Sequence, residues 1–191
     1  MSISITLHRS GTSRTQQVDT TTTGLDLFGS DRAVVAMRVD GNLVDLQREL
    51  HDGAEVEPVE ATSEDGLNII RHSATHVMAQ AVQQLYPEVN LGIGPFITDG
   101  FYYDFGNIEP VTPEVLSELE KRMKRIVKEN QRFVRRVTTE ESAREELADQ
   151  PYKLELIGTK GKGAEGASVE VGGGELTIYD NVRRNGEVAW K

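Results

Sequence analysis

Residues 67–87, LNIIRHSATHVMAQAVQQLYP, constrain the fold of this chain more than any other segment. The apolar residues in this run recur at intervals of three and four, the spacing of an amphipathic helix that packs one stripe on a core. They are Leu67, Ile70, Ala74, Val77, Met78, Ala81 and Leu85. Because proline has no backbone N–H to donate, Pro87 predicts that the helix ends at Tyr86.

Two histidines lie four residues apart on this predicted helix. His72 and His76 therefore project from one face, well round from the apolar stripe. Such a pair is either solvated or faces a second layer, where neutral imidazoles can ligate a metal, hold a water or move a proton. The spacing leaves both interpretations open, and a zinc site needs at least a third protein ligand.

Composition narrows the class of protein. A chain of 191 residues with 37% hydrophobic and 27% charged residues indicates a soluble globular protein with room for two small domains. We expect a cytoplasmic protein, since no run reaches the roughly 18 apolar residues of a membrane span and the start does not read as a signal peptide. The absence of cysteine excludes disulfides, a thiol nucleophile and cysteine-bound zinc within these residues.

The net charge of -10 argues against binding of nucleic acid by the whole surface. One segment is different, because residues 121–136 hold eight basic residues opposed only by Glu129. This segment is either a solvated surface or a contact for nucleic-acid phosphate. The candidate RNA contacts within it are Lys121, Arg122, Lys124, Arg125 and Lys128.

The first 61 residues predict a compact α+β roll of short elements without catalytic features. Alternation and turn residues predict strands at 2–8, 16–19, 33–39, 43–46 and 55–60, with a short helix at 20–29. The phrase VDGNLVDLQRELHDGAEVEPVEA, residues 39–61, resembles the second half of a TGS domain, a ubiquitin-like β-grasp module. That resemblance implies a domain over residues 1–61 that binds or positions a partner.

The rest of the chain also predicts mixed helices and strands. Residues 61–66 form a polar joint in which Ser63 caps the histidine helix, and residues 101–105 form a strand between two glycines. Thr112 and Pro113 predict the start of a helix. Its expected buried stripe is Val115, Leu116, Leu119, Met123, Ile126 and Val127.

Four shorter elements are expected after this helix. Residues 133–137 predict a strand, and Thr138 with Glu141 predicts a capping box for a helix over 140–148. The glycine-rich segment 158–174 predicts a mobile loop or hairpin tip. Strands at 176–179 and 187–190 are expected to be joined by a turn at Asn185-Gly186.

The segments RHSATHVMAQAVQQLYP and IGPFITDGFYYDF together resemble the editing domain of threonyl-tRNA synthetases, which in bacteria directly follows a TGS domain. The resemblance implies that residues 62–191 form an α+β editing domain with an antiparallel sheet and a long histidine-bearing helix. It implies hydrolysis of seryl-tRNA made wrongly on threonine tRNA. The implied catalytic residues are His72, His76 and Lys153, and the implied substrate contacts are Tyr103, Asp104, Gly94 and Pro95.

In that family the last strand continues into a segment of the type DxCxGPH, whose cysteine and histidine complete the site. This sequence ends at Lys191 before such a segment, so we expect a fragment of a longer synthetase with impaired hydrolysis and poor zinc affinity. No metal or cofactor is expected within the fragment, whereas zinc, magnesium and ATP are expected for the full synthetase, a homodimer. The alternative function is a non-catalytic module that docks tRNA or a partner protein.

Overall fold

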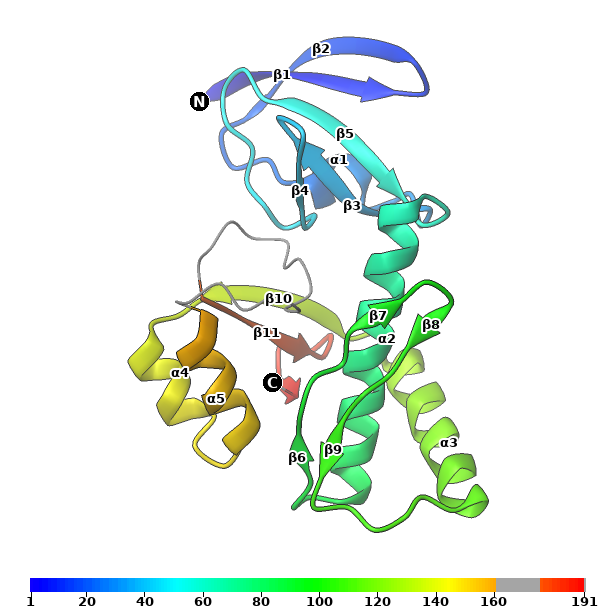
Figure 1. The fold of residues 1–191 in the computed structure, drawn as a ribbon. Helices are drawn as coiled ribbons and strands as arrows, with labels where there is room; N and C mark the ends of the chain where they lie inside the picture. Colours follow the sequence, from blue (N-terminus) through cyan, green and yellow to red (C-terminus); the bar gives the residue numbers. More distant parts are fainter. Residues whose placement is uncertain (161–175, 191) are drawn as a thin grey trace. The chain divides into compact units, whose positions relative to one another are not determined.

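The structure of the protein is a computed structural model that describes residues 1–160 and 176–190 (Figure 1). The described residues form two compact units, and the chain is α+β, as the sequence predicts. The first unit comprises residues 1–70 and the second begins at Arg71. The boundary therefore lies inside the histidine helix, a few residues beyond the expected polar joint.

The first unit is a mixed five-stranded sheet in the order β2-β1-β5-β3-β4. Strands β1 and β5 are parallel neighbours at its centre, and the other pairs are antiparallel. This is the arrangement expected of a β-grasp module, with the first and last strands side by side. Its elements are β1 (Ser2–Arg9), β2 (Thr12–Asp19), α1 (Gly24–Phe28), β3 (Val34–Val39), β4 (Asn42–Val44) and β5 (Glu55–Glu60).

Alternating side chains from the strands of the first unit meet Phe28 of α1 in one core. Ile5 and Met37 are completely buried there, and Phe28 is nearly so. Helix α1 is shorter than the predicted helix over residues 20–29, because Thr23 is its N-cap. The Asp26 carboxylate accepts a hydrogen bond from the Thr23 backbone N–H at 2.8 Å, which stabilises that start.

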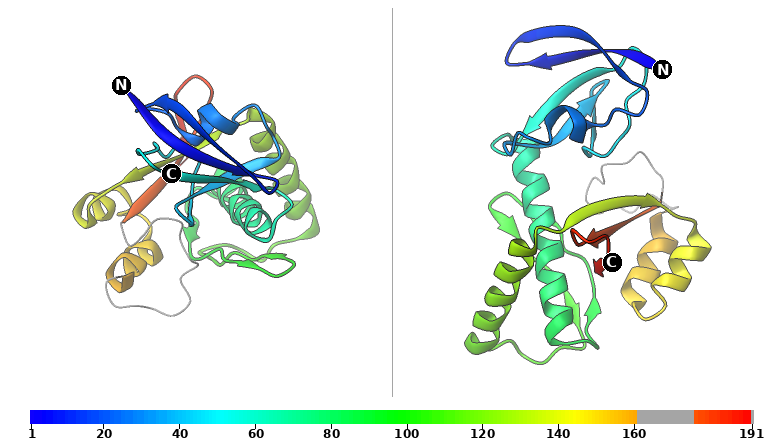
Figure 2. Two further views of the ribbon diagram at one scale, coloured as in Figure 1. Left: turned by 90° about the horizontal axis from the view of Figure 1, so that it is seen from above. Right: turned by 180° about the vertical axis from the view of Figure 1, so that it is seen from behind.

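The second unit is built around α2 (Glu64–Leu85), the predicted histidine helix. Figures 1 and 2 show α3 along one side of α2 and the β10-β11 layer on another. Strands β10, β11 and β12 form an antiparallel sheet, and β6–β9 and β7–β8 form two short ladders. The other elements are β6 (Asn90–Leu91), β7 (Phe96–Ile97), β8 (Gly100–Phe101), β9 (Phe105–Gly106), α3 (Pro113–Glu129), β10 (Arg132–Val137), α4 (Glu140–Glu146), α5 (Pro151–Lys160), β11 (Thr177–Val182) and β12 (Val188–Trp190).

Helix α2 is covered on every side over one turn in its C-terminal part. Residues 79–82 are all 1% exposed or less, and four consecutive helical side chains point about 100° apart around the axis. The predicted single apolar stripe therefore accounts for only part of the surface that α2 buries. Leu67 and Ile70, expected in the core, are exposed, whereas polar Gln80 is buried and accepts a hydrogen bond from Asn181 of β11 at 3.1 Å.

The predicted strand over residues 101–105 is wrong, because this segment pairs with two different partners. Phe101 in β8 pairs with Phe96 of β7, whereas Phe105 in β9 pairs with Leu91 of β6. The residues between them leave the ladder, although the Asp104 N–H still donates to the Ile93 carbonyl at 2.9 Å. Residues 101, 103 and 105 therefore do not share one face of a continuous strand.

Two further predictions in the second unit need correction. Helix α3 starts at Pro113 after Thr112, as predicted, but Leu116 and Val127 are exposed. Of the predicted stripe, Leu119 and Ile126 are buried, and Val115 and Met123 are half-buried. Helix α4 is capped by Thr139, whose hydroxyl accepts from the Ser142 N–H at 3.2 Å, rather than by Thr138. Residues 161–174 of the predicted glycine-rich loop lie outside the described residues.

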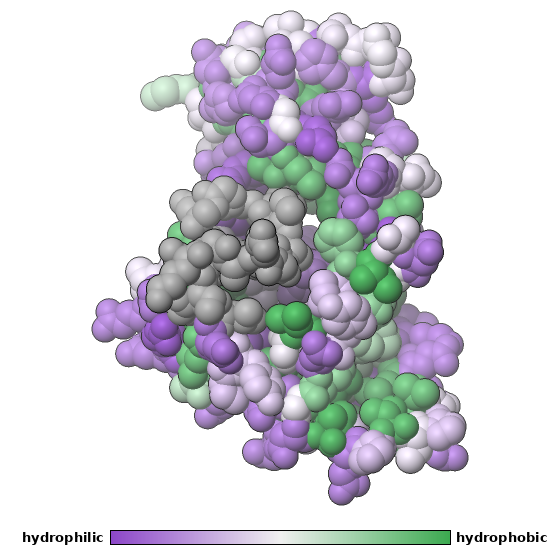
Figure 3. All heavy atoms as spheres, viewed as in Figure 1, coloured by the Kyte–Doolittle hydropathy of each residue, from purple (hydrophilic) through white to green (hydrophobic). Residues whose placement is uncertain are grey.

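Apolar side chains gather over β6 to β9 on the face drawn in Figure 3, whereas polar residues predominate at α4 and α5. The exposed apolar residues in the region of these strands include Ile93, Ile97 and Tyr102. Within residues 1–160 and 176–190, no helix is long and apolar enough to cross a membrane.

Arg136 of β10 links three elements of the second unit. Its guanidinium donates to Asp180 of β11 and to Glu146 of α4, each at 2.7 Å. These two carboxylates raise the pKa of Arg136, and Asp180 is only 7% exposed. The network therefore holds α4, and with it the following α5, against the sheet.

Replacing Arg136 should destabilise the second unit, because Asp180 and Glu146 would face each other without a cation. We expect Arg136→Met to lower the free energy of unfolding by about 2 to 4 kcal/mol, since Arg136 is itself partly solvated. Chemical denaturation measures this. The matched control is Arg144→Met, which removes an exposed i,i+4 pair with Glu140 on α4 and should cost less than about 0.5 kcal/mol. Equal losses in both variants would contradict the structural role of Arg136.

Candidate functional site

Helix α2 brings the two predicted catalytic histidines into direct contact. The Nε2 atoms of His72 and His76 are 3.2 Å apart, and the ring centroids are 4.9 Å apart at an interplanar angle of 78°. At that distance one Nε2 carries a hydrogen and the other accepts it. The pair therefore acts as a hydrogen-bonded unit rather than as two separate imidazoles.

Aromatic residues from the sheet enclose this pair. The ring of His76 meets Phe133 of β10 at 5.8 Å and Trp190 of β12 at 5.7 Å between centroids, both edge to face. The Trp190 indole N–H donates to Gln83 of α2 at 2.5 Å, which fixes the ring against the helix. The histidine face of α2 therefore meets a second layer, and the interpretation as a solvated face is wrong.

The surroundings of His76 favour its neutral form. Burial lowers the pKa of His76 to about 3, and the positive charges of His72 and Lys153 contribute in the same direction. Lys153, on α5, is therefore close enough for its ammonium to act on the histidine pair. At neutral pH, His76 is uncharged and can share a proton with His72 or accept one from a bound group.

Tyr103 and Gly94 form a second group of predicted site residues. The Tyr103 ring stacks on Phe105 at 4.7 Å, and a Cβ at Gly94 would lie 2.3 Å from the Tyr103 ring, so only glycine fits there. Burial raises the pKa of Tyr103 to about 12, which keeps its hydroxyl protonated at neutral pH. Pro95 is joined to the neighbouring strand through its carbonyl, which accepts from the Tyr102 N–H at 3.4 Å.

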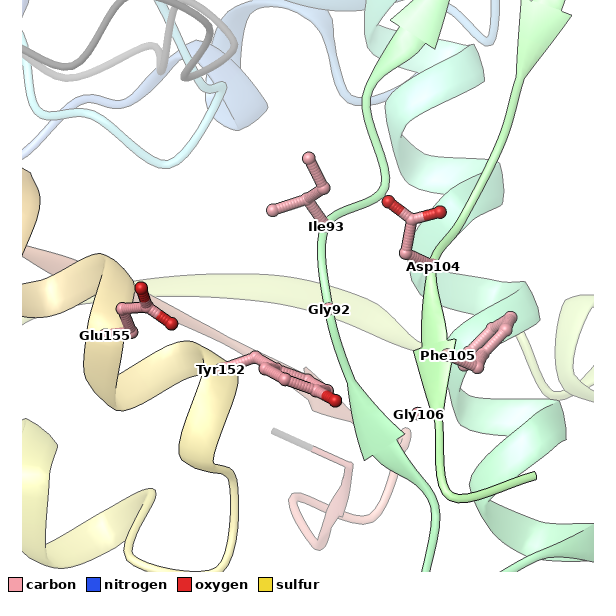
Figure 4. Close-up of a pocket in the computed structure, with 7 residues that line it drawn as sticks. All are labelled: Gly92, Ile93, Asp104, Phe105, Gly106, Tyr152 and Glu155. Atoms are coloured by element: carbon pink, nitrogen blue, oxygen red, sulfur yellow. The ribbon is translucent and has the colours of Figure 1, made fainter.

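Asp104 lies apart from both groups. Its side chain lines a hollow between α5 and the β6–β9 ladder, together with Tyr152 and Glu155 (Figure 4). The ring contacts of His76 are with His72, Phe133 and Trp190, whereas Tyr103 stacks on Phe105. The structure thus joins His72, His76 and Lys153, but leaves the role of the implied substrate contacts a prediction.

The five candidate RNA contacts divide into two kinds. Arg122 and Lys124 are held by Glu118 at 3.0 Å and Glu120 at 2.6 Å on the same helix. The other three follow one exposed stripe of α3 at positions i, i+4 and i+7, and make no ion pair among the described residues. They are Lys121, Arg125 and Lys128.

The sequence pattern did not predict that Phe133 and Trp190 contact His76, or that Gln83 holds Trp190. Gln83 lies seven residues after His76, on the same helix face, so helical periodicity was a signal for it. Trp190 and Phe133 are distant in sequence, and nothing local pairs them with the helix. Among residues 1–160 and 176–190, no group of three or more His, Cys, Asp or Glu side chains is placed to hold a metal ion.

Comparison with known proteins identifies the family. No family model matches the chain. It is 58% identical over 99% of its length to the threonine–tRNA ligase of Streptomyces avermitilis, and 55% identical over 99% to that of Streptomyces coelicolor. The chain belongs to the threonine–tRNA ligase family. It spans about 29% of the length of these two relatives, and 27% of that of the Streptomyces griseus ligase, to which it is 61% identical.

The lowered pKa of His76 predicts a loss of stability in acid. A buried neutral histidine stabilises the folded state above its unfolded pKa of 6.5, and this contribution is lost as pH falls from there toward about 3. We expect the free energy of unfolding to fall by up to about 1.4 kcal/mol per pH unit from this group. Denaturation between pH 7 and pH 4 measures the slope.

The variant His76→Phe keeps an aromatic ring in place and removes the titrating group, so its pH slope should be shallower. His51→Gln, at an exposed histidine of the first unit, is the control and should keep the original slope. A His76→Phe slope equal to that of the unchanged chain would show that His76 does not titrate in this way.

Proposed function

We propose that this chain is the editing part of a threonine–tRNA ligase, which hydrolyses the serine ester from threonine tRNA. The observation that carries the proposal is the contact between His72 and the buried, neutral His76, with the Lys153 charge nearby. Residues 1–61 serve as a TGS domain and residues 62–191 as the editing domain. The family to which the chain belongs supplies the class of substrate.

A ligase for threonine needs a second, hydrolytic site for a physical reason. Serine is threonine without one methyl group, so it fits any pocket that admits threonine. One methyl discriminates by only about 1 to 3 kcal/mol, or roughly 10- to 200-fold. A separate site that hydrolyses the wrong ester supplies the remaining accuracy.

The residues of the site suit ester hydrolysis. A neutral imidazole accepts a proton as water attacks the ester carbonyl carbon, and the bond between the two rings allows that proton to be shared. The Lys153 ammonium stabilises negative charge on the carbonyl oxygen. The carbon–oxygen bond to the ribose then breaks, the ribose oxygen takes a proton, and free serine leaves. Phe133 and Trp190 hold the His76 ring in place.

Hydrolysis of seryl-tRNA tests this proposal directly. Because the resemblance expects a further cysteine and histidine in a DxCxGPH segment, the assay uses this chain and a chain extended through that segment. We expect the extended chain to release serine from threonine tRNA, and this chain to do so more slowly. His72→Ala should reduce the rate by about 10²- to 10⁴-fold, the usual contribution of a general acid or base.

Threonyl-tRNA is the control substrate and should stay intact, while His51→Ala, at an exposed histidine, should leave serine release unchanged. Release of both amino acids at equal rates would contradict editing. Absence of release by the extended chain would leave a tRNA-docking module as the better account.

The basic stripe of Lys121, Arg125 and Lys128 favours this second function, docking of tRNA. Three exposed cations without ion pairs among the described residues suit contact with phosphates, despite the acidic chain as a whole. Docking and editing are compatible, because an editing site must also hold the tRNA that carries the ester. Docking alone would not need the histidine pair.

Salt-dependent tRNA binding distinguishes the stripe from its paired neighbours. Changing Lys121, Arg125 and Lys128 to Gln together should weaken binding and reduce the slope of log affinity against log salt by about 2 to 3. The matched control changes Arg122 and Lys124 to Gln, which already pair with glutamates and should change the slope by less than about 1. A larger effect from the control pair would place the contact on another face of α3.

The remaining length of the relatives is the proposed location of the ligase reaction. We assign the requirements for ATP, magnesium and zinc, and the contacts of a homodimer, to that portion of a full ligase. The proposed setting is protein synthesis in the cytoplasm.

A further inference from the structure

Gln80 of α2 and Asn181 of β11 form a buried amide pair that the proposed hydrolysis does not use. Gln80 is 0% exposed and Asn181 is 1% exposed. The Asn181 amide nitrogen donates to the Gln80 side-chain oxygen at 3.1 Å. Two amides joined by one such bond still have one nitrogen and one oxygen to satisfy. These atoms are Nε2 of Gln80 and Oδ1 of Asn181, and neither has a hydrogen-bond partner among residues 1–160 and 176–190.

His76 of the candidate site lies on the same face of α2 as Gln80. The two residues are four positions apart, which is about one helical turn. Long side chains on a helix lean toward its N-terminus, so the Gln80 side chain leans over the turn that carries His76. Nδ1 of His76 is also buried and has no hydrogen-bond partner in the described part of the chain. Polar atoms that are buried and unpartnered therefore lie on this face of α2 and on the strand opposite.

These atoms need a partner that can both donate and accept. Nε2 of Gln80 can only donate, and Oδ1 of Asn181 can only accept. Buried polar atoms in folded proteins are bonded either to other protein atoms or to ordered water. One water molecule has two hydrogens to donate and two lone pairs, and a buried water typically makes about three hydrogen bonds to the protein. A water that accepts from Gln80 and donates to Asn181 still has capacity for Nδ1 of His76.

We propose that Gln80 and Asn181 hold a buried water molecule against Nδ1 of His76 and are positioning residues for the histidine pair. This inference deepens the proposed function, and its catalytic part rests on it. The buried water is distinct from the water that attacks the ester, because all three of its protein partners are buried atoms. The attacking water must instead reach the substrate.

Nδ1 of His76 must change its hydrogen-bonding role with the position of the proton in the pair. The two Nε2 atoms, 3.2 Å apart, share one hydrogen. When His76 carries that hydrogen on Nε2, its neutral ring leaves Nδ1 bare, as an acceptor. When His72 carries it, Nδ1 of His76 holds a hydrogen and is a donor. Water serves both states by turning, whereas an amide nitrogen serves only the first.

The same water supports the protonated form of His76. In the proposed hydrolysis the histidine pair takes a proton from the attacking water, and an imidazolium ring carries hydrogen on both nitrogens. The buried water then accepts from Nδ1 of His76, while Nε2 donates to His72. Burial opposes the positive charge and lowers the pKa of His76, so a partner that turns toward the charge makes proton uptake less unfavourable.

Water contacts measured by NMR on this chain test the site without any need for hydrolysis. We expect magnetisation transfer from water to the side-chain amide protons of Gln80 and Asn181, with the sign of a long-lived contact. Gln84 is the control, because it lies on the same helix with an exposed side chain and should show no long-lived contact. Absence of a long-lived contact at both buried amides would overturn the proposal.

Changing both amides to leucine removes the water site without leaving one amide unpaired. Replacing both partners by apolar groups of similar size is nearly neutral for stability, so Gln80→Leu with Asn181→Leu should remain folded. Thermal unfolding checks this. The ¹⁵N signal of His76 Nδ1 should move in this double variant, because its partner is gone, whereas Gln84→Leu should leave the signal in place. An unmoved signal in the folded double variant would also overturn the proposal.

Hydrolysis of seryl-tRNA by the extended chain tests the positioning role. We expect the double variant to lower kcat by about tenfold, less than the loss of about 10²- to 10⁴-fold on removal of a general acid or base. KM should stay within about twofold, because neither amide contacts the substrate in the proposed mechanism. An unchanged kcat would overturn the positioning role.

The buried water and the editing function can fail separately. If the extended chain hydrolyses seryl-tRNA but the water contacts are absent, only the water site is wrong. If the contacts and the change in the His76 signal are observed without any hydrolysis, the water site stands and the editing function is wrong.

Discussion

The packing of α2 between two layers is the constraint on which the second unit depends. Its apolar side packs with residues of α3 and of strands β6 and β9, while its histidine side packs on β10 and β12. The side of the helix that carries His76 therefore faces aromatic rings rather than bulk water. Burial therefore lowers the pKa of His76 and keeps its imidazole neutral, which is the protonation state that can accept a proton from water.

The same packing places two amides of α2 against partners in the sheet. Gln80 meets Asn181 of β11, and Gln83 meets Trp190 of β12, so two amides fix the helix against the sheet. Each bond forms only when this face of α2 points toward the sheet, so the bonds fix the helix relative to β11 and β12. The histidine pair is rigid because its neighbours on the same face are held in this way.

Two sets of contacts position helix α5. Arg136 holds α4 to the sheet, and Gln150, just before α5, accepts a hydrogen bond from the Leu91 N–H of β6 at 2.8 Å. These contacts place Lys153 near the histidines and Tyr152 at the hollow. The Lys153 side chain is flexible and has many rotamers. Its position therefore depends on where α5 places its backbone.

Local sequence determined the histidine pair, the helix that carries it, the order of elements in the first unit and the cap of α3, because each depends on residues within a few positions. It misjudged residues 101–105, where one segment serves two partner strands, and Leu67, Ile70, Leu116 and Val127, which periodicity alone assigns to a core. Only the tertiary structure decided that His76 contacts Phe133 and Trp190, and that Asp104 and Tyr152 line one hollow. His76 and Phe133 are 57 positions apart in the sequence, and His76 and Trp190 are 114 positions apart. At such separations the local sequence pattern carries no information about which residues meet.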